Sequence, residues 1–109
     1  MKDELSQIYS KQQLEHIIEE AMIYMCACPA QVAEQLVRLR ELFAYQKHCM
    51  SDSSLMKDVH TRIAESTRKA HAEMELCLRE VLQMEGWDPK TLSMPAGLRQ
   101  LREKIIDQD

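Results

Sequence analysis

The sequence is poor in the residues that build turns. It contains two glycines and three prolines among 109 residues, whereas a β-sandwich or barrel needs a turn signal roughly every 8 to 12 residues. A sheet-rich fold is therefore excluded, and the chain is expected to be all-α. Hydrophobic residues make up 45% and charged residues 29% of the chain, which is typical of one globular domain. Residues 1–109 are predicted to form a single helical domain.

Long apolar runs and clustered positive charge are also missing. No apolar run approaches the roughly 18 residues of a membrane span, and the N-terminus lacks the apolar stretch of a signal peptide. The 14 Lys and Arg are dispersed and outnumbered by 18 Asp and Glu, whereas nucleic-acid affinity comes from clustered cations. We expect a cytoplasmic protein that binds neither membrane nor nucleic acid. Thiols stay reduced in that compartment, so the four cysteines are interpreted as core residues or ligands before disulfides.

A capping box opens the first helix. Ser10 and Gln13 have the S-x-x-Q spacing in which each side chain binds the other residue's backbone N–H. Tyr9 and Leu14 stand at the two positions of a hydrophobic staple around the same helix start. Apolar residues then recur at helical spacing as far as Met25. A helix is therefore predicted to begin just after Ser10.

Pro29 poses the main question about the architecture. Proline removes a helical hydrogen bond and disfavours helix at the residue before it. However, its neighbours include no Gly, Asn, Asp or Ser with which to build a loop. At about 100° per residue, the apolar stripes before and after Pro29 point in the same direction. We therefore predict one kinked helix from about Ser10 to Cys49, with an abrupt break at Pro29 as the alternative.

A second long helix is predicted over residues 55–85, which contain neither Gly nor Pro. The cluster Ser51 to Ser54 supplies the turn and cap before it, and Gly86 suits the position that closes it. Its apolar stripe consists of Met56, Val59, Ile63, Ala70, Met74, Cys77, Val81 and Met84. Further apolar residues, Leu55, Ala64, Leu78 and Leu82, widen the stripe to about half of the helix circumference. One neighbouring helix cannot cover such a wide arc.

These elements predict a long helical hairpin followed by a short helix. Asp88 and Pro89 open a short turn, and the last helix starts between Ser93 and Pro95. One short C-terminal helix cannot hide the wide arc of the second helix. We therefore predict a homodimer in which two hairpins assemble as a helical bundle.

Three cysteines form the sharpest candidate site. The antiparallel hairpin is expected to place Cys77 level with Cys26 and Cys28 beside Pro29. Thiolates suit zinc or Cu(I), and Cys28-Pro29 resembles the Cys-Pro dipeptide of haem-responsive proteins. The Cys-x-Cys spacing is not the usual C-x-x-C, however, and free cysteines commonly pack as small core residues. Metal or haem binding or redox sensing through these three residues is therefore the alternative function, and no cofactor is predicted.

Two histidine-glutamate pairs stand one helical turn apart, as di-iron carboxylate sites require. His16 and Glu20 point away from the apolar stripe, and His71 and Glu75 lie on the flank of the other stripe. We interpret all four as solvated polar residues.

The remaining signals favour a binding protein over an enzyme. The sequence contains no G-x-S-x-G, no Gly-rich phosphate loop and no H-E-x-x-H. Tyr45 and Trp87 lie off the stripes and are expected on the surface, where exposed aromatic residues near helix ends are reasonable partner contacts. The sequence therefore predicts a small, non-enzymatic cytoplasmic adaptor or regulator that acts as a homodimer and binds an unidentified protein.

Overall fold

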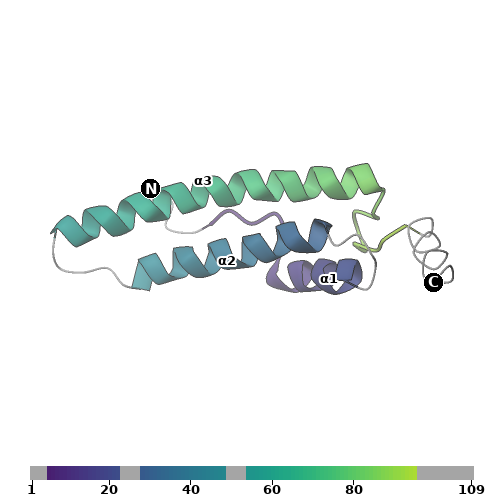
Figure 1. Cartoon of the computed structure of the whole chain (residues 1–109), viewed down its shortest axis with the longest axis horizontal. Helices are drawn as coiled ribbons and strands as arrows, with labels where there is room; N and C mark the ends of the chain where they lie inside the picture. Colours follow the sequence, from purple (N-terminus) through teal and green to yellow (C-terminus); the bar gives the residue numbers. More distant parts are fainter. Residues whose placement is uncertain (1–4, 23–27, 49–53, 96–109) are drawn as a thin grey trace, which may run out of the picture.

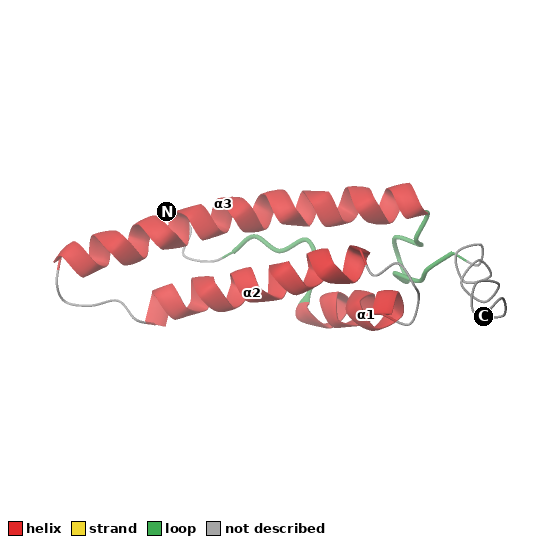
Figure 2. Cartoon of the chain, in the orientation of Figure 1, coloured by secondary structure: helices red, strands yellow, loops and turns green. Residues whose placement is uncertain are grey.

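The protein is all-helical, as predicted. The computed structural model describes residues 5–22, 28–48 and 54–95. These ranges contain α1 (Lys11–Met22), α2 (Cys28–His48) and α3 (Ser54–Glu85), joined by loops and without a strand (Figure 2). The molecule is elongated, with extents of 61 × 27 × 19 Å. None of the helices in these ranges combines the length and the apolar character that a membrane crossing requires.

The predicted capping box is confirmed at the start of α1. The Ser10 N–H donates to Gln13 Oε1 at 2.8 Å, and the Gln13 N–H donates to Ser10 Oγ at 3.1 Å. Tyr9 and Leu14 are both buried in the main core. The helix therefore begins where its local sequence satisfies the first free N–H groups.

The continuous kinked helix is wrong. The first helix ends at Met22, a separate helix begins at Cys28, and the chain runs in opposite directions in the two (Figure 1). Pro29 is the second residue of α2, where its missing N–H costs no helical hydrogen bond. Antiparallel packing brings α1 against α2 and buries Leu14 and Ile17 completely. The agreement in direction between the stripes before and after Pro29 was thus a coincidence.

α2 is the central helix of the described residues, because it contacts both α1 and α3. α1 lies alongside the half of α2 that begins at Cys28, and the α2–α3 hairpin extends well past it (Figure 1). Ala30 and Ala33 are fully buried, and their small side chains allow the helices to approach closely. Residues 5–10 precede α1 as a non-helical segment that passes between α2 and α3 (Figure 1).

α3 ends at Glu85, immediately before the glycine that was predicted to close it. The Trp87 N–H donates to the Leu82 carbonyl at 2.9 Å and the Gly86 N–H to the Gln83 carbonyl at 3.1 Å. These bonds define a Schellman motif, in which the residue after the helix adopts a positive φ. The φ of Gly86 is +80°.

The residues after α3 form a turn that returns to α1. Asp88 accepts the N–H groups of Lys90 and Thr91 at 2.7 and 3.0 Å, which agrees with the short turn predicted to open at Asp88 and Pro89. The Met94 N–H donates to Glu20 Oε1 at 3.1 Å. Residues 93–95 are not helical, and the rest of the predicted C-terminal helix lies outside the described residues.

Candidate functional site

The centre of the molecule holds a buried polar cluster formed by Arg40, His71 and Glu75. His71 and Glu75 each expose 1% of their surface, and the Arg40 side chain exposes 14%. Arg40 Nε donates to His71 Nε2 at 2.9 Å, and Arg40 Nη2 lies 3.3 Å from Glu75 Oε2. The cluster joins α2 to α3 through charged groups, in a region where unpaired charge is costly.

The same cluster binds the backbone of the segment that precedes α1. Glu75 Oε2 accepts the N–H groups of Ile8 at 2.7 Å and Tyr9 at 3.1 Å. Arg40 Nη2 donates to the Tyr9 carbonyl at 2.7 Å. Two side chains thus satisfy three backbone groups of a non-helical segment that has no regular hydrogen-bonding partner. The arrangement positions the start of α1.

The hydrogen bonds determine the protonation state of His71. A guanidinium can only donate, so Nε2 of His71 accepts and its ring hydrogen is on Nδ1. That nitrogen lies 3.7 Å from Glu75 Oε1, which is too long for a hydrogen bond. Burial lowers the pKa of His71, the nearby Glu75 opposes this and Arg40 reinforces it. The ring is therefore held neutral.

The interpretation of His71 and Glu75 as solvated residues is wrong. Both residues are buried because they belong to the side of α3 that packs against the rest of the molecule. That side is a line of residues that includes polar as well as apolar side chains. The buried residues of α3 recur at three- and four-residue spacing and are His60, Ala64, Thr67, His71, Glu75, Leu78 and Leu82. A search for apolar residues alone misses this line, but helical spacing that includes His, Thr and Glu would have found it.

The apolar stripe predicted for α3 lies about a quarter turn away from that buried line. Its members are half-buried or exposed, and Met84 is 85% exposed. Glu75, at the edge of the buried line, and Arg79 beyond it lie toward the segment before α1, and the stripe lies on the opposite side. On α2, Val32, Leu39 and Leu42 occupy the corresponding side, away from α1.

These residues form one apolar surface along the hairpin, which we term the bare face. Among the described residues, no helix packs over it. It consists of Val32, Leu39 and Leu42 of α2 with Val59, Ile63, Ala70, Met74, Cys77, Val81 and Met84 of α3. None of the ten is charged and each is exposed or half-buried, although Val32 and Met74 also pack against the core. Of the described residues, 5–22 thus cover one side of the hairpin and none packs over the other.

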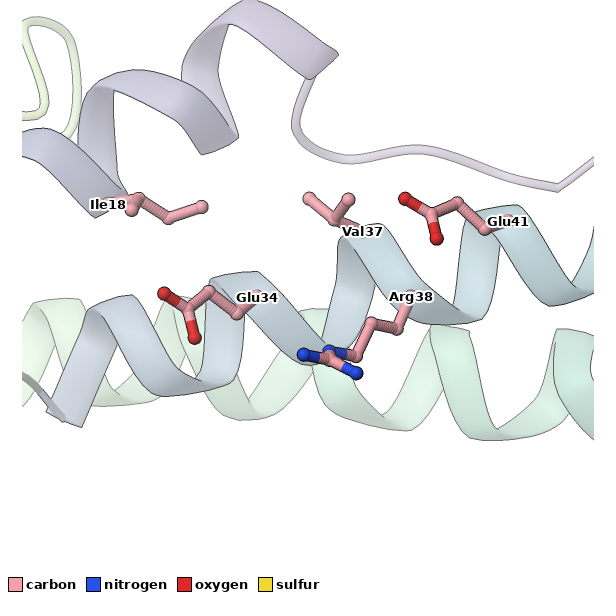
Figure 3. A pocket seen from close by; sticks show the side chains of 5 residues that line it. All are labelled: Ile18, Glu34, Val37, Arg38 and Glu41. Carbon is pink, nitrogen blue, oxygen red and sulfur yellow. The ribbon is translucent and has the colours of Figure 1, made fainter.

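Two hollows lie on the covered side. The larger, about 380 Å³, is an open groove between Ile18 of α1 and Val37 of α2 with a charged rim formed by Glu34, Arg38 and Glu41 (Figure 3). The smaller, about 240 Å³, lies beside the segment before α1 and near Arg79 and Trp87. It is smaller than the roughly 300 to 1,000 Å³ of most ligand pockets. Neither hollow contains an arrangement of side chains suited to catalysis.

The three-cysteine site stays a prediction, because Cys26 lies outside the described residues. Cys28 is exposed at the start of α2, Cys77 is half-buried on the bare face, and both are free of disulfides. Within residues 5–22, 28–48 and 54–95, no three His, Cys, Asp or Glu side chains gather closely enough to hold a metal ion.

The two aromatic residues predicted to contact a protein partner differ in their exposure. Tyr45 is 57% exposed near the end of α2, so its role as a partner contact stays a prediction. Trp87 is 4% exposed, and the expectation that it lies on the surface is wrong. The Schellman motif folds Trp87 back toward Leu82, and its Nε1 donates to Glu85 at 2.9 Å.

Comparison with known proteins finds no matching family, no similar curated protein and no similar solved structure.

Proposed function

We propose that this protein is a small non-enzymatic adaptor or regulator of the cytoplasm, acting as a homodimer that binds a further protein. This proposal rests on the bare face. Ten uncharged residues extend along both helices of the hairpin on the side that residues 5–22 leave uncovered. Apolar residues gathered on one side of a helix pair in this way are typical of a protein interface.

The shape of the bare face favours a second copy of the hairpin as its occupant. The face extends along a pair of antiparallel helices, and two such pairs packed face to face make a four-helix bundle. A closed two-fold arrangement buries the same surface on both subunits. Tyr45, 57% exposed, lies outside the bare face near the end of α2 that α1 does not reach, and we assign the contact with a further partner to it.

Substitution of Val59 by glutamate tests the homodimer. Val59 is 40% exposed in the single chain, so Val59→Glu costs the fold little. In a dimer, the same change places a charge in an apolar contact. We expect the wild type to sediment as a dimer at micromolar concentration and Val59→Glu to sediment as a helical monomer, measured by analytical ultracentrifugation and circular dichroism.

Ala72 provides the control. It lies on α3, is exposed and is located on the side of the helix opposite the bare face, so Ala72→Glu should remain a dimer. A wild type that sediments as a monomer would overturn the homodimer. A monomer whose Cys77 is also unreactive toward thiol reagents would indicate that the chain covers its own bare face.

A further inference from the structure

The apolar positions of α3 on the bare face are nearly symmetric about the middle of the helix. Ile63 and Val59 precede Ala70 by about two and three helical turns, and Val81 and Met84 follow Met74 by the same intervals. A second α3 running in the opposite direction therefore presents apolar residues at matching heights. Val59 then meets Met84 of the partner subunit.

Four charged residues along one edge of the bare face are positive in the first half of α3 and negative in the second half. Arg62 and Lys69 lie in its first half, and Glu73 and Glu80 in its second half. All four are exposed, and at about 100° per residue they lie on one side of α3, next to the bare face and away from α2. The sign of this edge thus changes from positive to negative along the helix.

Antiparallel pairing makes these edges complementary. In an antiparallel helix pair each edge faces the same edge of the other helix, so Arg62 meets Glu80 of the partner subunit and Lys69 meets Glu73 of the partner subunit. Both pairs have their midpoint at residue 71, which is also close to the centre of the apolar pattern. A parallel two-fold pair brings opposite edges of the two helices together instead, so it forms neither of these ion pairs.

We infer that the homodimer forms by antiparallel packing of α3 against α3 of the second copy, with the two-fold axis at the height of His71. This inference rests on the proposed homodimer and specifies its geometry. The same axis brings the two α2 helices together and completes the four-helix bundle.

Exchange of two charges tests the geometry. Arg62→Glu and Glu80→Arg each convert two intersubunit attractions into repulsions and should each weaken the dimer about tenfold in Kd. The double variant Arg62→Glu/Glu80→Arg should restore the wild-type Kd. The two residues lie about 27 Å apart on one straight helix, so the rescue must occur between subunits. Sedimentation equilibrium at low ionic strength measures all four Kd values.

Two variants on α1 control for net charge. Lys11 and Glu19 are exposed there, and Lys11→Glu and Glu19→Arg make the same changes in charge as the two test variants. Both should leave the Kd unchanged. A wild-type dimer that is insensitive to the single variants, or is not rescued by the double variant, would overturn the antiparallel geometry and leave the homodimer standing. A monomeric wild type would overturn both.

Discussion

Glu75 is an acidic residue in an unusual place, at the centre of a small helical protein. Its carboxylate accepts the N–H groups of Ile8 and Tyr9 and lies beside the guanidinium of Arg40. Buried charge is tolerated only when its partners compensate for lost hydration. At this position the partners come from the segment before α1 and from α2, so one side chain connects three parts of the chain.

Replacement of this carboxylate should destabilise the fold strongly. Glu75→Gln keeps the size of the side chain but leaves the guanidinium of Arg40 buried without its counter-charge. We expect the free energy of unfolding to fall by about 3 kcal/mol, measured by urea denaturation followed by circular dichroism. Glu19→Gln on the exposed side of α1 is the control and should change it by less than about 0.5 kcal/mol. Equal effects of the two substitutions would contradict the role of the cluster.

His71 should make stability depend on pH. Burial lowers its folded pKa below the ordinary value of 6.5, so the unfolded chain binds the proton first as pH falls. The contribution of neutral His71 to the free energy of unfolding is complete above about pH 6.5 and is lost progressively as the pH falls below that value. Protonation also places a hydrogen on Nε2, opposite Arg40 Nε. Urea denaturation at pH 8 to 5 should show this loss, and His71→Gln should show a shallower decline. Parallel profiles for the two proteins would exclude His71 as the group responsible.

Local sequence decides where α1 begins and where α3 ends. The capping box of Ser10 and Gln13 opens α1, and Gly86 closes α3. Each motif satisfies backbone groups that the helix leaves unpaired, using residues within one turn. Their hydrogen bonds therefore follow from a few neighbouring residues whatever the rest of the chain does.

Gly86→Ala tests the closing motif of α3. The φ of +80° is unfavourable for a residue with a Cβ. The added atom would meet Pro95 at 3.8 Å, an ordinary contact, so the cost arises from the backbone alone. We expect a loss of about 1 kcal/mol in the free energy of unfolding, measured by thermal denaturation. Gly86→Asn should lose less, because asparagine tolerates this conformation. An alanine variant as stable as the wild type would exclude a conformational role for Gly86.

At the scale of the whole molecule, the two sides of the hairpin have different surroundings. Residues 5–22 cover one side, and the bare face occupies the other along a molecule 61 Å long. The wide apolar arc predicted for residues 55–85 agrees with this division, because the buried residues of α3 form a line through Leu78 and Leu82 that takes up only part of the arc. The uncovered part of the arc is the physical basis for the proposed dimer.

The sequence by itself determined the all-helical class, the start of α1 and the end of α3. These depend on periodicity and on hydrogen bonds between residues a few positions apart. Only the tertiary structure decided the reversal between α1 and α2, the burial of His71 and Glu75, and the burial of Trp87. His71 becomes a core residue because Arg40, 31 positions earlier in the chain, donates a hydrogen bond to it. Glu75 likewise depends on backbone groups 66 and 67 positions away. Helical periodicity carries no information about such distant partners, because it records only which residues share a face of one helix.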